Sequence, residues 1–176
     1  MPETARRERF EQTVLPHLDA AYNLARWLTR NEQDAQDVTQ EAFLRAFRFF
    51  EGYQGGNMRA WLLTIVRNTC YTWLRQNRPP DSAEVFDEEI HSNELPGGAD
   101  PELQVLANAD KATVHRALEE LPRIFREVLV LRELEGMSYK EIADVACVSL
   151  GTVMSRLARA RTRLRQSLGA ALGKES

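Results

Sequence analysis

The segment 79–109 constrains the fold more than any other part of the sequence, because it divides the chain into two short halves. Prolines and a Gly97-Gly98 pair lie in it among acidic residues, and from Asp81 to Asp110 there are nine acids and no lysine or arginine. The segment lacks helical periodicity, and such a composition buries too little apolar surface to fold alone. We therefore expect a linker at 79–109 between two domains, at 1–78 and 110–176.

Apolar residues in the first half recur every three or four positions, which is the spacing of helices. We expect a break or kink at Pro16, an N-cap at Asn31, and a further helix at 58–76 after the glycine-containing turn 52–57. The buried faces expected for these helices comprise Phe10, Val14, Leu18, Ala21, Ala25 and Leu28, then Ala35, Val38, Ala42, Ala46 and Phe49, then Leu62, Ile65, Val66, Thr69 and Trp73.

The second half shows the same periodicity. We expect helices from Asp110 to Leu121 and from Pro122 to Glu135, the latter ending at Gly136. Ser138 and Glu141 are spaced as a capping box, and Ser149 is an N-cap for the last helix, which has apolar residues at 153, 157, 160, 164 and 168. No alternating strand pattern of useful length occurs, so the predicted fold class is all-α, with two small helical domains joined by an acidic linker.

Composition argues against several classes of protein. No apolar run approaches the roughly 18–20 residues that span a bilayer, and the charged N-terminus lacks the apolar core of a signal peptide, so we expect a cytoplasmic protein without membrane insertion. Cys70 and Cys147 lie far apart and are expected to be small core residues. The three histidines are equally scattered, so neither a metal site nor a cofactor is expected.

The net charge of −3 conceals two strongly basic segments. Residues 52–80 contain four arginines and no acid, and residues 152–167 contain five arginines and no acid. Nucleic-acid binding depends on such local footprints rather than on the net charge.

Two capped helices joined by residues 146–149 predict a helix-turn-helix, whose second helix enters the major groove of DNA. Arginine suits this role because its guanidinium can pair with guanine through two hydrogen bonds. Cys147 occupies a turn position where glycine is common, at a cost of about 1 kcal/mol if the backbone is left-handed. The candidate DNA contacts here are Ser149, Gly151, Thr152, Ser155, Arg156, Arg159 and Arg163, with Leu150 among the early residues of the helix.

A second basic surface is predicted on the helix before the linker. Arg67, Tyr71, Arg75 and Arg78 follow one helical stripe, which suits a phosphate backbone with bases stacked beside it. The preceding turn places the amide side chains of Gln54 and Asn57 beside Arg59, where they could read unstacked bases. Trp61 and Trp73 are expected to pack in the core.

A third surface is acidic with one apolar member. If Ala35, Val38 and Ala42 are buried, the next helix turns other side chains outward, and alone this pattern fits a solvated surface equally well. The outward residues are Asp34, Asp37, Gln40, Glu41 and Leu44.

Taken together, three segments in order resemble the extracytoplasmic-function sigma factors of the sigma-70 family. Residues 34–43 (DAQDVTQEAF) resemble the helix that grips the clamp of the RNA polymerase largest subunit, and 57–68 (NMRAWLLTIVRN), which includes Asn68, resemble the segment that melts the −10 element. Residues 121–132 (LPRIFREVLVLR), 139–143 (YKEIA) and 151–161 (GTVMSRLARAR) resemble the region that reads the −35 element. Cys147 departs from the family pattern.

The resemblance implies a non-enzymatic promoter-recognition subunit. Its partners would be the clamp and flap of the polymerase core, promoter DNA and an anti-sigma factor, which could hold it at the inner membrane, and no small-molecule substrate is implied. Two alternatives remain open at this point. One is a free-standing helix-turn-helix regulator with an N-terminal sensor domain, and the other is a nuclease with metal ligands among Asp34, Asp37 and Glu41.

Overall fold

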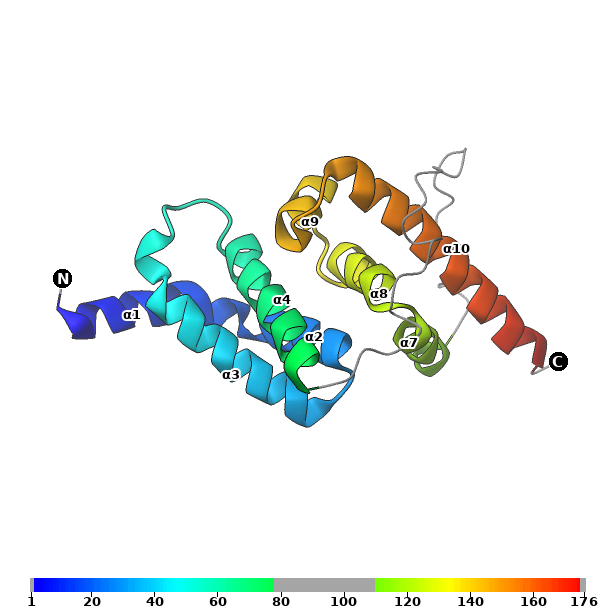
Figure 1. The fold of residues 1–176 in the computed structure, drawn as a ribbon, viewed down its shortest axis with the longest axis horizontal. Coiled ribbons are helices and arrows are strands. Elements are labelled where there is room, and N and C mark those ends of the chain that lie inside the picture. Colours follow the sequence, from blue (N-terminus) through cyan, green and yellow to red (C-terminus); the bar gives the residue numbers. More distant parts are fainter. Residues whose placement is uncertain (1, 78–109, 175–176) are drawn as a thin grey trace. The chain divides into compact units, whose positions relative to one another are not determined.

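The structure is a computed structural model that describes residues 2–77 and 110–174, with side chains as far as residue 170. All regular secondary structure in these residues is helical (Figure 1), which confirms the predicted fold class. The predicted linker and Arg78 lie outside the described residues. No helix within the described ranges is long and apolar enough to cross a membrane.

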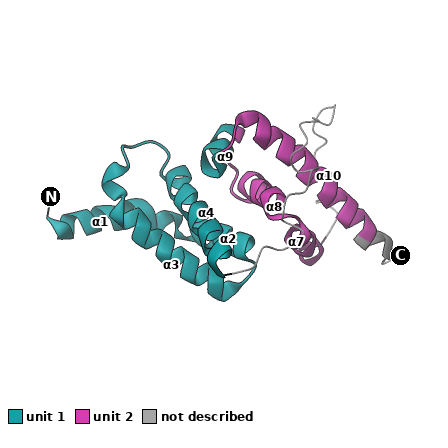
Figure 2. Ribbon diagram, viewed as in Figure 1, with its two compact units in different colours: residues 1–79, 140–147 teal, residues 80–139, 148–176 magenta. Residues whose placement is uncertain are grey.

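The chain divides into two compact units (Figure 2). One comprises residues 1–79 and 140–147, and the other comprises residues 80–139 and 148–176. This division assigns the short helix α9 (Tyr139–Ala146) mainly to the first unit. The domain bounds expected from the sequence, 1–78 and 110–176, therefore stay a prediction.

The first unit is built on three helices that contact one another, α2 (Leu18–Thr29), α3 (Glu32–Arg48) and α4 (Met58–Asn77). The buried stripe of α3 consists of Ala35, Val38, Ala42 and Ala46, all fully buried. Because helix separation depends on the side chains at the contact, these small residues let α3 approach its neighbours closely. Asn31 caps α3 as predicted, since its side chain accepts a hydrogen bond of 2.9 Å from the Asp34 amide.

An aromatic cluster joins the first helix to the loop before α4. Helix α1 (Glu3–Val14) ends at a short 3-10 turn, η1 (Leu15–His17), which contains Pro16 and confirms the predicted break. Phe10 of α1 makes edge-on contacts with Phe47 and with Phe50 of η2 (Phe50–Gly52), at ring separations of 5.2 and 5.4 Å. Tyr53 stacks on Phe50, and its hydroxyl donates a 2.7 Å hydrogen bond to the Gly56 carbonyl. The cluster thereby fixes the start of the loop.

Some side chains expected in the core of the first unit are not buried. Leu18 is 41% exposed and Phe49 is 58% exposed, while Ile65 and Trp73 are half-buried. Leu18 begins α2 and Phe49 follows the last residue of α3, so both stand at helix ends, where neighbouring helices cover less of the surface. Helical periodicity identifies a face but does not show how far along that face the neighbours extend.

The second unit is organised by its last helix. Helix α10 (Leu150–Lys174) packs against α7 (Lys111–Glu120) and α8 (Arg123–Leu129), and Phe125, Val128, Leu157 and Leu164 are buried there. All five predicted apolar positions of α10 are at most 1% exposed.

The turns of this unit largely follow the prediction. Pro122 precedes α8 rather than beginning it, because its ψ of 146° is extended. The π-helical turn η3 (Val130–Leu134) follows α8, and the chain then turns at Gly136, whose φ of 65° is left-handed as predicted for a helix end. Asp110 caps α7, and the hydrogen bond from the Thr113 amide, 2.7 Å, lowers the pKa of its carboxyl below the ordinary value.

The two cysteines have different environments. Cys70 is buried, as expected, but Cys147 is exposed, so its expected place in the core is wrong. Cys147 lies in the turn between α9 and α10 with φ at 58°, the left-handed conformation that glycine adopts at no steric cost. The backbone of this turn is therefore left-handed despite the side chain.

Replacing Cys147 by glycine should raise the free energy of unfolding by about 0.5–1 kcal/mol, measured by urea unfolding with circular dichroism. The left-handed conformation costs a residue with a Cβ roughly 1–2 kcal/mol, and glycine's greater freedom in the unfolded chain offsets part of that gain. Cys147→Ala is the matched control, because it removes the thiol but keeps the Cβ. Equal stabilisation by both variants would assign the effect to the thiol and contradict the prediction.

Candidate functional site

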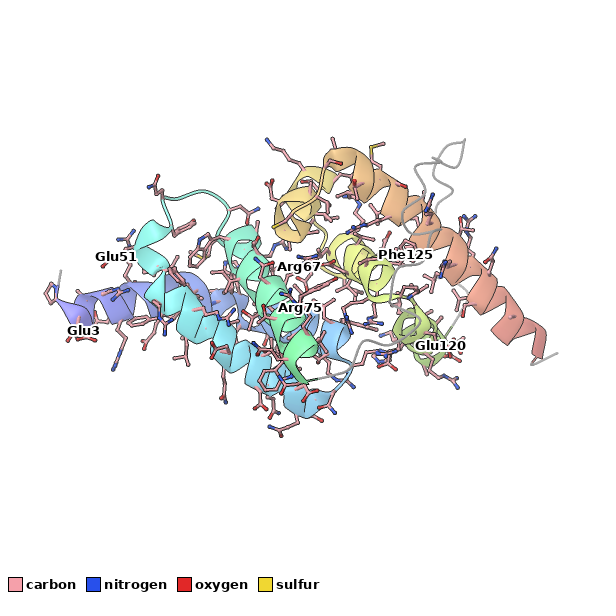
Figure 3. The ribbon with its side chains drawn as sticks, in the orientation of Figure 1. Glu3, Glu51, Arg67, Arg75, Glu120 and Phe125 are labelled. Carbon is pink, nitrogen blue, oxygen red and sulfur yellow. The ribbon has the colours of Figure 1, made fainter. Side chains whose placement is uncertain are left out.

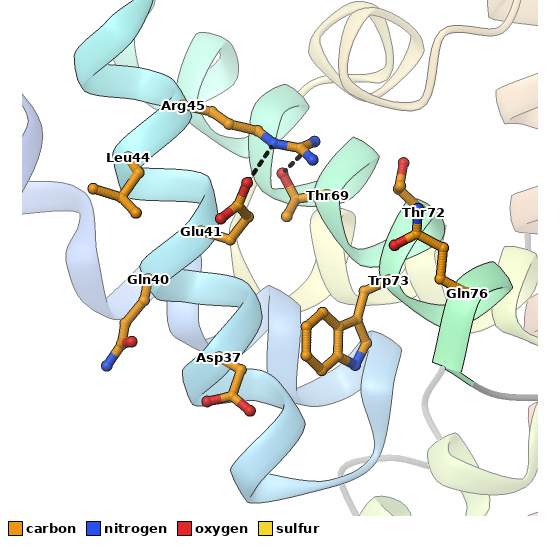
Figure 4. Close-up of a pocket in the computed structure, with 9 residues that line it drawn as sticks. All are labelled: Asp37, Gln40, Glu41, Leu44, Arg45, Thr69, Thr72, Trp73 and Gln76. Carbon is orange, nitrogen blue, oxygen red and sulfur yellow. Dashed lines mark hydrogen bonds and ion pairs between the residues drawn. The ribbon is translucent and has the colours of Figure 1, made fainter.

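A groove between α3 and α4 brings together most of the predicted acidic surface. Its volume is about 350 Å³, and Figure 4 shows side chains from both helices around it. It is lined by Asp37, Gln40, Glu41, Leu44, Arg45, Thr69, Thr72, Trp73 and Gln76. Four of the five residues predicted on α3 are among these, while Asp34, in the first turn of α3, is not.

The sequence of α3 explains why these residues face outward. Its alanine stripe is turned into the core, so residues 37, 40, 41 and 44, spaced by three or four, share the opposite side. Leu44 is 64% exposed. A leucine so exposed beside acidic and amide groups combines apolar and polar character in one surface, as protein interfaces do.

The carboxylates of the groove differ in their surroundings. Arg45 donates from Nε to Glu41 at 3.1 Å and from Nη1 to the Thr69 hydroxyl at 3.5 Å (Figure 4), so the Glu41 charge is partly balanced. Asp37 accepts a 3.2 Å hydrogen bond from the neutral amide of Gln33. The negative charge of the lining therefore lies mainly at Asp37.

The second wall of the groove was missed by the sequence reasoning. Trp73, expected in the core, is half-buried and its ring extends from α4 toward α3 (Figure 4). Its indole nitrogen is buried and has no hydrogen-bond partner in the described part of the chain. A buried donor without an acceptor is costly, so Trp73 is a side chain of the groove whose polar atom this part of the chain leaves unsatisfied. The sequence signal for this wall was the spacing of residues 69, 72, 73 and 76, which places them on one face of the helix.

The predicted basic stripe of α4 is a long surface rather than a pocket. Arg67 lies over the ring of Tyr71 at 4.0 Å and reaches the Asn68 side chain at 3.4 Å. Arg75 is exposed in the last turn, and Figure 3 shows both arginines along α4. From Asn57 to Arg75 the helix rises about 27 Å, which matches an extended strand of several nucleotides better than one bound group.

The loop before α4 contains two glycines with left-handed backbone. Gly55 and Gly56 have φ of 91° and 98°, and Gln54 and Asn57 are exposed, while Arg59 is half-buried. Asn57 also caps α4, because its side-chain oxygen accepts a 3.1 Å hydrogen bond from the Ala60 amide. The loop therefore leaves the Gln54 amide exposed beside the start of a basic helix, while the Asn57 amide nitrogen donates to Glu141 and the Arg59 guanidinium lies 4.0 Å from the same carboxylate.

The start of α10 carries the predicted cap. The Ser149 hydroxyl accepts a 3.2 Å hydrogen bond from the Thr152 amide and lies 2.9 Å from the Thr152 hydroxyl. Gly151 is exposed, whereas Thr152 and Ser155 are half-buried. The cap fixes the first turn of the helix that the sequence predicts to contact bases.

The five arginines of α10 have different surroundings. Arg161, only 8% exposed, bonds to Glu133 at 3.1 Å, and Arg163 lies over the Phe125 ring at 5.0 Å. Arg156 and Arg159 are half-buried beside the first turns, and a terminal nitrogen of Arg156 is buried without a partner among the described residues. The predicted basic face therefore has two kinds of arginine. Arg156 and Arg159 lie near the first turns of α10, whereas Arg161 and Arg163 contact other helices of the same domain.

The nuclease alternative requires acidic ligands close together. Within residues 2–77 and 110–170, no group of three or more His, Cys, Asp or Glu side chains could hold a metal ion. Asp34, Asp37 and Glu41 are all described, and they are not gathered into such a group.

Comparison with known proteins relates both halves of the chain to one family. Residues 13–79 match Sigma-70 region 2, and residues 111–164 match Sigma-70 region 4. The RNA polymerase sigma-H factor of Pseudomonas aeruginosa is 36% identical over 168 residues, covering 90% of this chain and 86% of that protein. The ECF RNA polymerase sigma-E factor of Escherichia coli is 38% identical over 134 residues, covering 73% of this chain and 70% of that protein.

Two solved structures are similar to this one. The sigma factor RpoE from Bartonella quintana, in complex with the anti-sigma factor NepR, has a TM-score of 0.70 at 30% identity, covering 92% of this chain and 98% of that chain. CnrH, in complex with the cytosolic domain of CnrY, has a TM-score of 0.64 at 28% identity, covering 97% of this chain and 91% of that chain.

Proposed function

The chain belongs to the extracytoplasmic-function RNA polymerase sigma factors of the sigma-70 family, and we propose that three separate surfaces divide its work in promoter recognition. Sigma factors direct RNA polymerase core to promoters and are not enzymes, so the family confirms the predicted function and the expected absence of catalysis. The roles of the individual residues and of the domains 1–78 and 110–176 are part of this proposal.

The groove between α3 and α4 binds the clamp of the polymerase core. The observation that carries this assignment is the groove itself, whose lining includes the exposed Leu44, the Asp37 carboxylate and the Trp73 ring. A basic, helical partner surface fits this combination, because it supplies cations for the carboxylate and apolar side chains for Leu44. Asp34 extends the acidic surface beyond the groove.

The loop and the stripe of α4 bind the single-stranded −10 element. Gln54, Asn57 and Arg59 lie at the loop end of this surface, where a base taken from the stack is bound, and Arg67, Asn68, Tyr71 and Arg75 continue along the helix. Removing a base from the duplex costs a few kcal/mol, which stacking and phosphate contacts must offset. The surface from Asn57 to Arg75 extends for about 27 Å, which is long enough for a single strand of several nucleotides.

The second helix of the helix-turn-helix, α10, recognises the −35 duplex. Its first turns carry Ser149, Gly151, Thr152, Ser155, Arg156 and Arg159, and Arg163 follows two turns after Arg156. We assign base-edge contacts to Arg156 and Arg159, and we assign Arg163, which lies over the Phe125 ring, a phosphate contact.

An anti-sigma factor regulates this chain. The support is that the sigma factor RpoE, whose structure is similar to this one, forms a complex with the anti-sigma factor NepR, and that the similar CnrH forms a complex with the cytosolic domain of CnrY. Such a partner acts by covering the polymerase-binding or DNA-binding surfaces, and it would hold a cytoplasmic sigma factor in an inactive state, in some cases at the membrane.

In-vitro transcription with purified polymerase core on a library of genomic promoters tests the proposal. Initiation at a defined set of promoters only when the chain is added supports it, and no initiation above core alone contradicts it. A gel shift without polymerase distinguishes a sigma factor from a free-standing helix-turn-helix regulator, because such a regulator binds duplex DNA specifically by itself.

Arg156→Ala should weaken binding of the reconstituted holoenzyme to its −35 element by about 1–3 kcal/mol, which is the value of a good contact between arginine and a base. The holoenzyme affinity is measured on promoters with the native and a scrambled −35 element. Gln166→Ala, an exposed residue farther along α10, is the control and should change neither affinity. Equal losses on native and scrambled sequences would show that Arg156 contacts only phosphate.

A further inference from the structure

The base-reading end of α10 carries an apolar pair that the functions assigned above do not use. Leu150 and Met154 are 50% and 48% exposed, and they are four residues apart, so they are neighbours on one helix face. Gly151, beside them, is exposed and has no side chain to cover them. A single exposed apolar residue needs no explanation, but two together in the first two turns of a DNA-reading helix do.

The position of Met154 places it at the edge of the outward face of α10. The buried row of the helix runs through Val153, Leu157 and Ala160, and successive residues are turned by about 100°. Met154 therefore lies between this buried row and Ser155, whose face also carries Arg159. A helix that presents Ser155 and Arg159 to base edges brings Met154 to the same groove.

Only one base presents an apolar group in the major groove, the C5-methyl group of thymine. Every A·T or T·A pair carries one such methyl group. Methionine suits this contact, because its unbranched thioether side chain is flexible and polarisable and adapts to an irregular surface. The neighbouring arginines select guanine or phosphate and cannot make this distinction.

We propose that Met154, supported by Leu150, recognises a thymine methyl group in the −35 element and so selects an A·T pair at that position. The inference rests on the proposed role of α10 at the −35 element and goes beyond it by naming the chemical group that is read. The contact involves no charge, so it differs from an arginine contact in its salt dependence.

Replacement of thymine by deoxyuridine tests the contact, because it removes the methyl group and keeps base pairing. The holoenzyme containing the full chain is first used to select its preferred −35 sequence, and each thymine on either strand is then replaced singly. At one position the affinity of the wild-type holoenzyme should fall about fourfold, the value of one buried methyl-sized group. In the Met154→Ala holoenzyme the affinity for the thymine promoter should be similarly reduced, and deoxyuridine should cause no further loss there.

Two further measurements separate this contact from other roles of Met154. The salt dependence of binding should be unchanged in Met154→Ala, whereas loss of a phosphate contact reduces its slope by about one. Met154→Leu, which keeps an apolar side chain, should retain part of the deoxyuridine effect, and Gln166→Ala should retain all of it.

The inference is overturned if deoxyuridine has no effect at any −35 position, or if Met154→Ala keeps the full effect. These results leave the proposed function intact as long as the holoenzyme still prefers its selected −35 sequence over a scrambled one. A holoenzyme without any −35 preference would instead contradict the role assigned to α10, and this inference with it.

Discussion

Leu44→Asp should weaken binding of the chain to RNA polymerase core by about 2–3 kcal/mol, or roughly 30- to 150-fold. Leu44 is 64% exposed in the free protein and lies on the groove between α3 and α4, where the proposed partner would cover it. The substitution removes an apolar contact and brings a carboxylate into a surface that excludes water on binding. The dissociation constant for labelled chain and purified core is the measurement.

Leu15→Asp is the matched control for this variant. Leu15 is 46% exposed, lies in the first unit and does not line the groove. Because both leucines are exposed, both variants should keep their folding stability, and only Leu44→Asp should lose core binding. Equal binding by the two aspartate variants would contradict the assignment of the groove.

Arg126→Ala should destabilise the second unit by about 3 kcal/mol, a large part of the stability of so small a domain. The Arg126 side chain is fully buried and donates to the backbone carbonyls of Leu121 at 2.8 Å and Glu119 at 3.2 Å. It thus joins the end of α7 to α8. Truncation to alanine leaves those carbonyls without these donors and opens a cavity.

The chain offers a way to observe the two units separately during unfolding. All three tryptophans, Trp27, Trp61 and Trp73, belong to the first unit, so tryptophan fluorescence reports on that unit while circular dichroism reports on both. Arg126→Ala should shift part of the circular-dichroism transition to lower urea and leave the fluorescence transition in place. Arg116→Ala, an exposed arginine on α7, should shift neither by more than about 0.5 kcal/mol. A shift confined to fluorescence would contradict the prediction.

Local patterns in the sequence were reliable where the physics is local. Asn31 and Ser149 cap the helices that they were predicted to cap, and Pro16 interrupts the first helical stretch. The turn at Cys147 is another local feature. Its left-handed backbone was expected from the capped helices on either side of it, although cysteine itself does not favour that conformation. A cap or a turn depends on hydrogen bonds between residues three or four apart, which the order of the chain already specifies.

The sequence failed where a residue's role depends on a distant segment. Trp73 was assigned to the core, but it forms a wall of the groove, because α3 and α4 meet along an edge that leaves its ring half-covered. Arg163 was grouped with Arg156 and Arg159 from helical spacing alone, and the structure adds that it lies over the Phe125 ring of another helix. The periodicity of one helix contains no information about which groups its neighbours present.

The sequence alone determined the helical class, the two-part organisation, the caps and the family, because each depends on composition, on spacing within a few residues, or on segments matched in order. Only the tertiary structure decided which outward residues form a groove and which arginines are already engaged, and that Leu150 and Met154 stay exposed. The physical reason is that burial and pairing are properties of surfaces in contact, and those surfaces come from helices far apart in the chain.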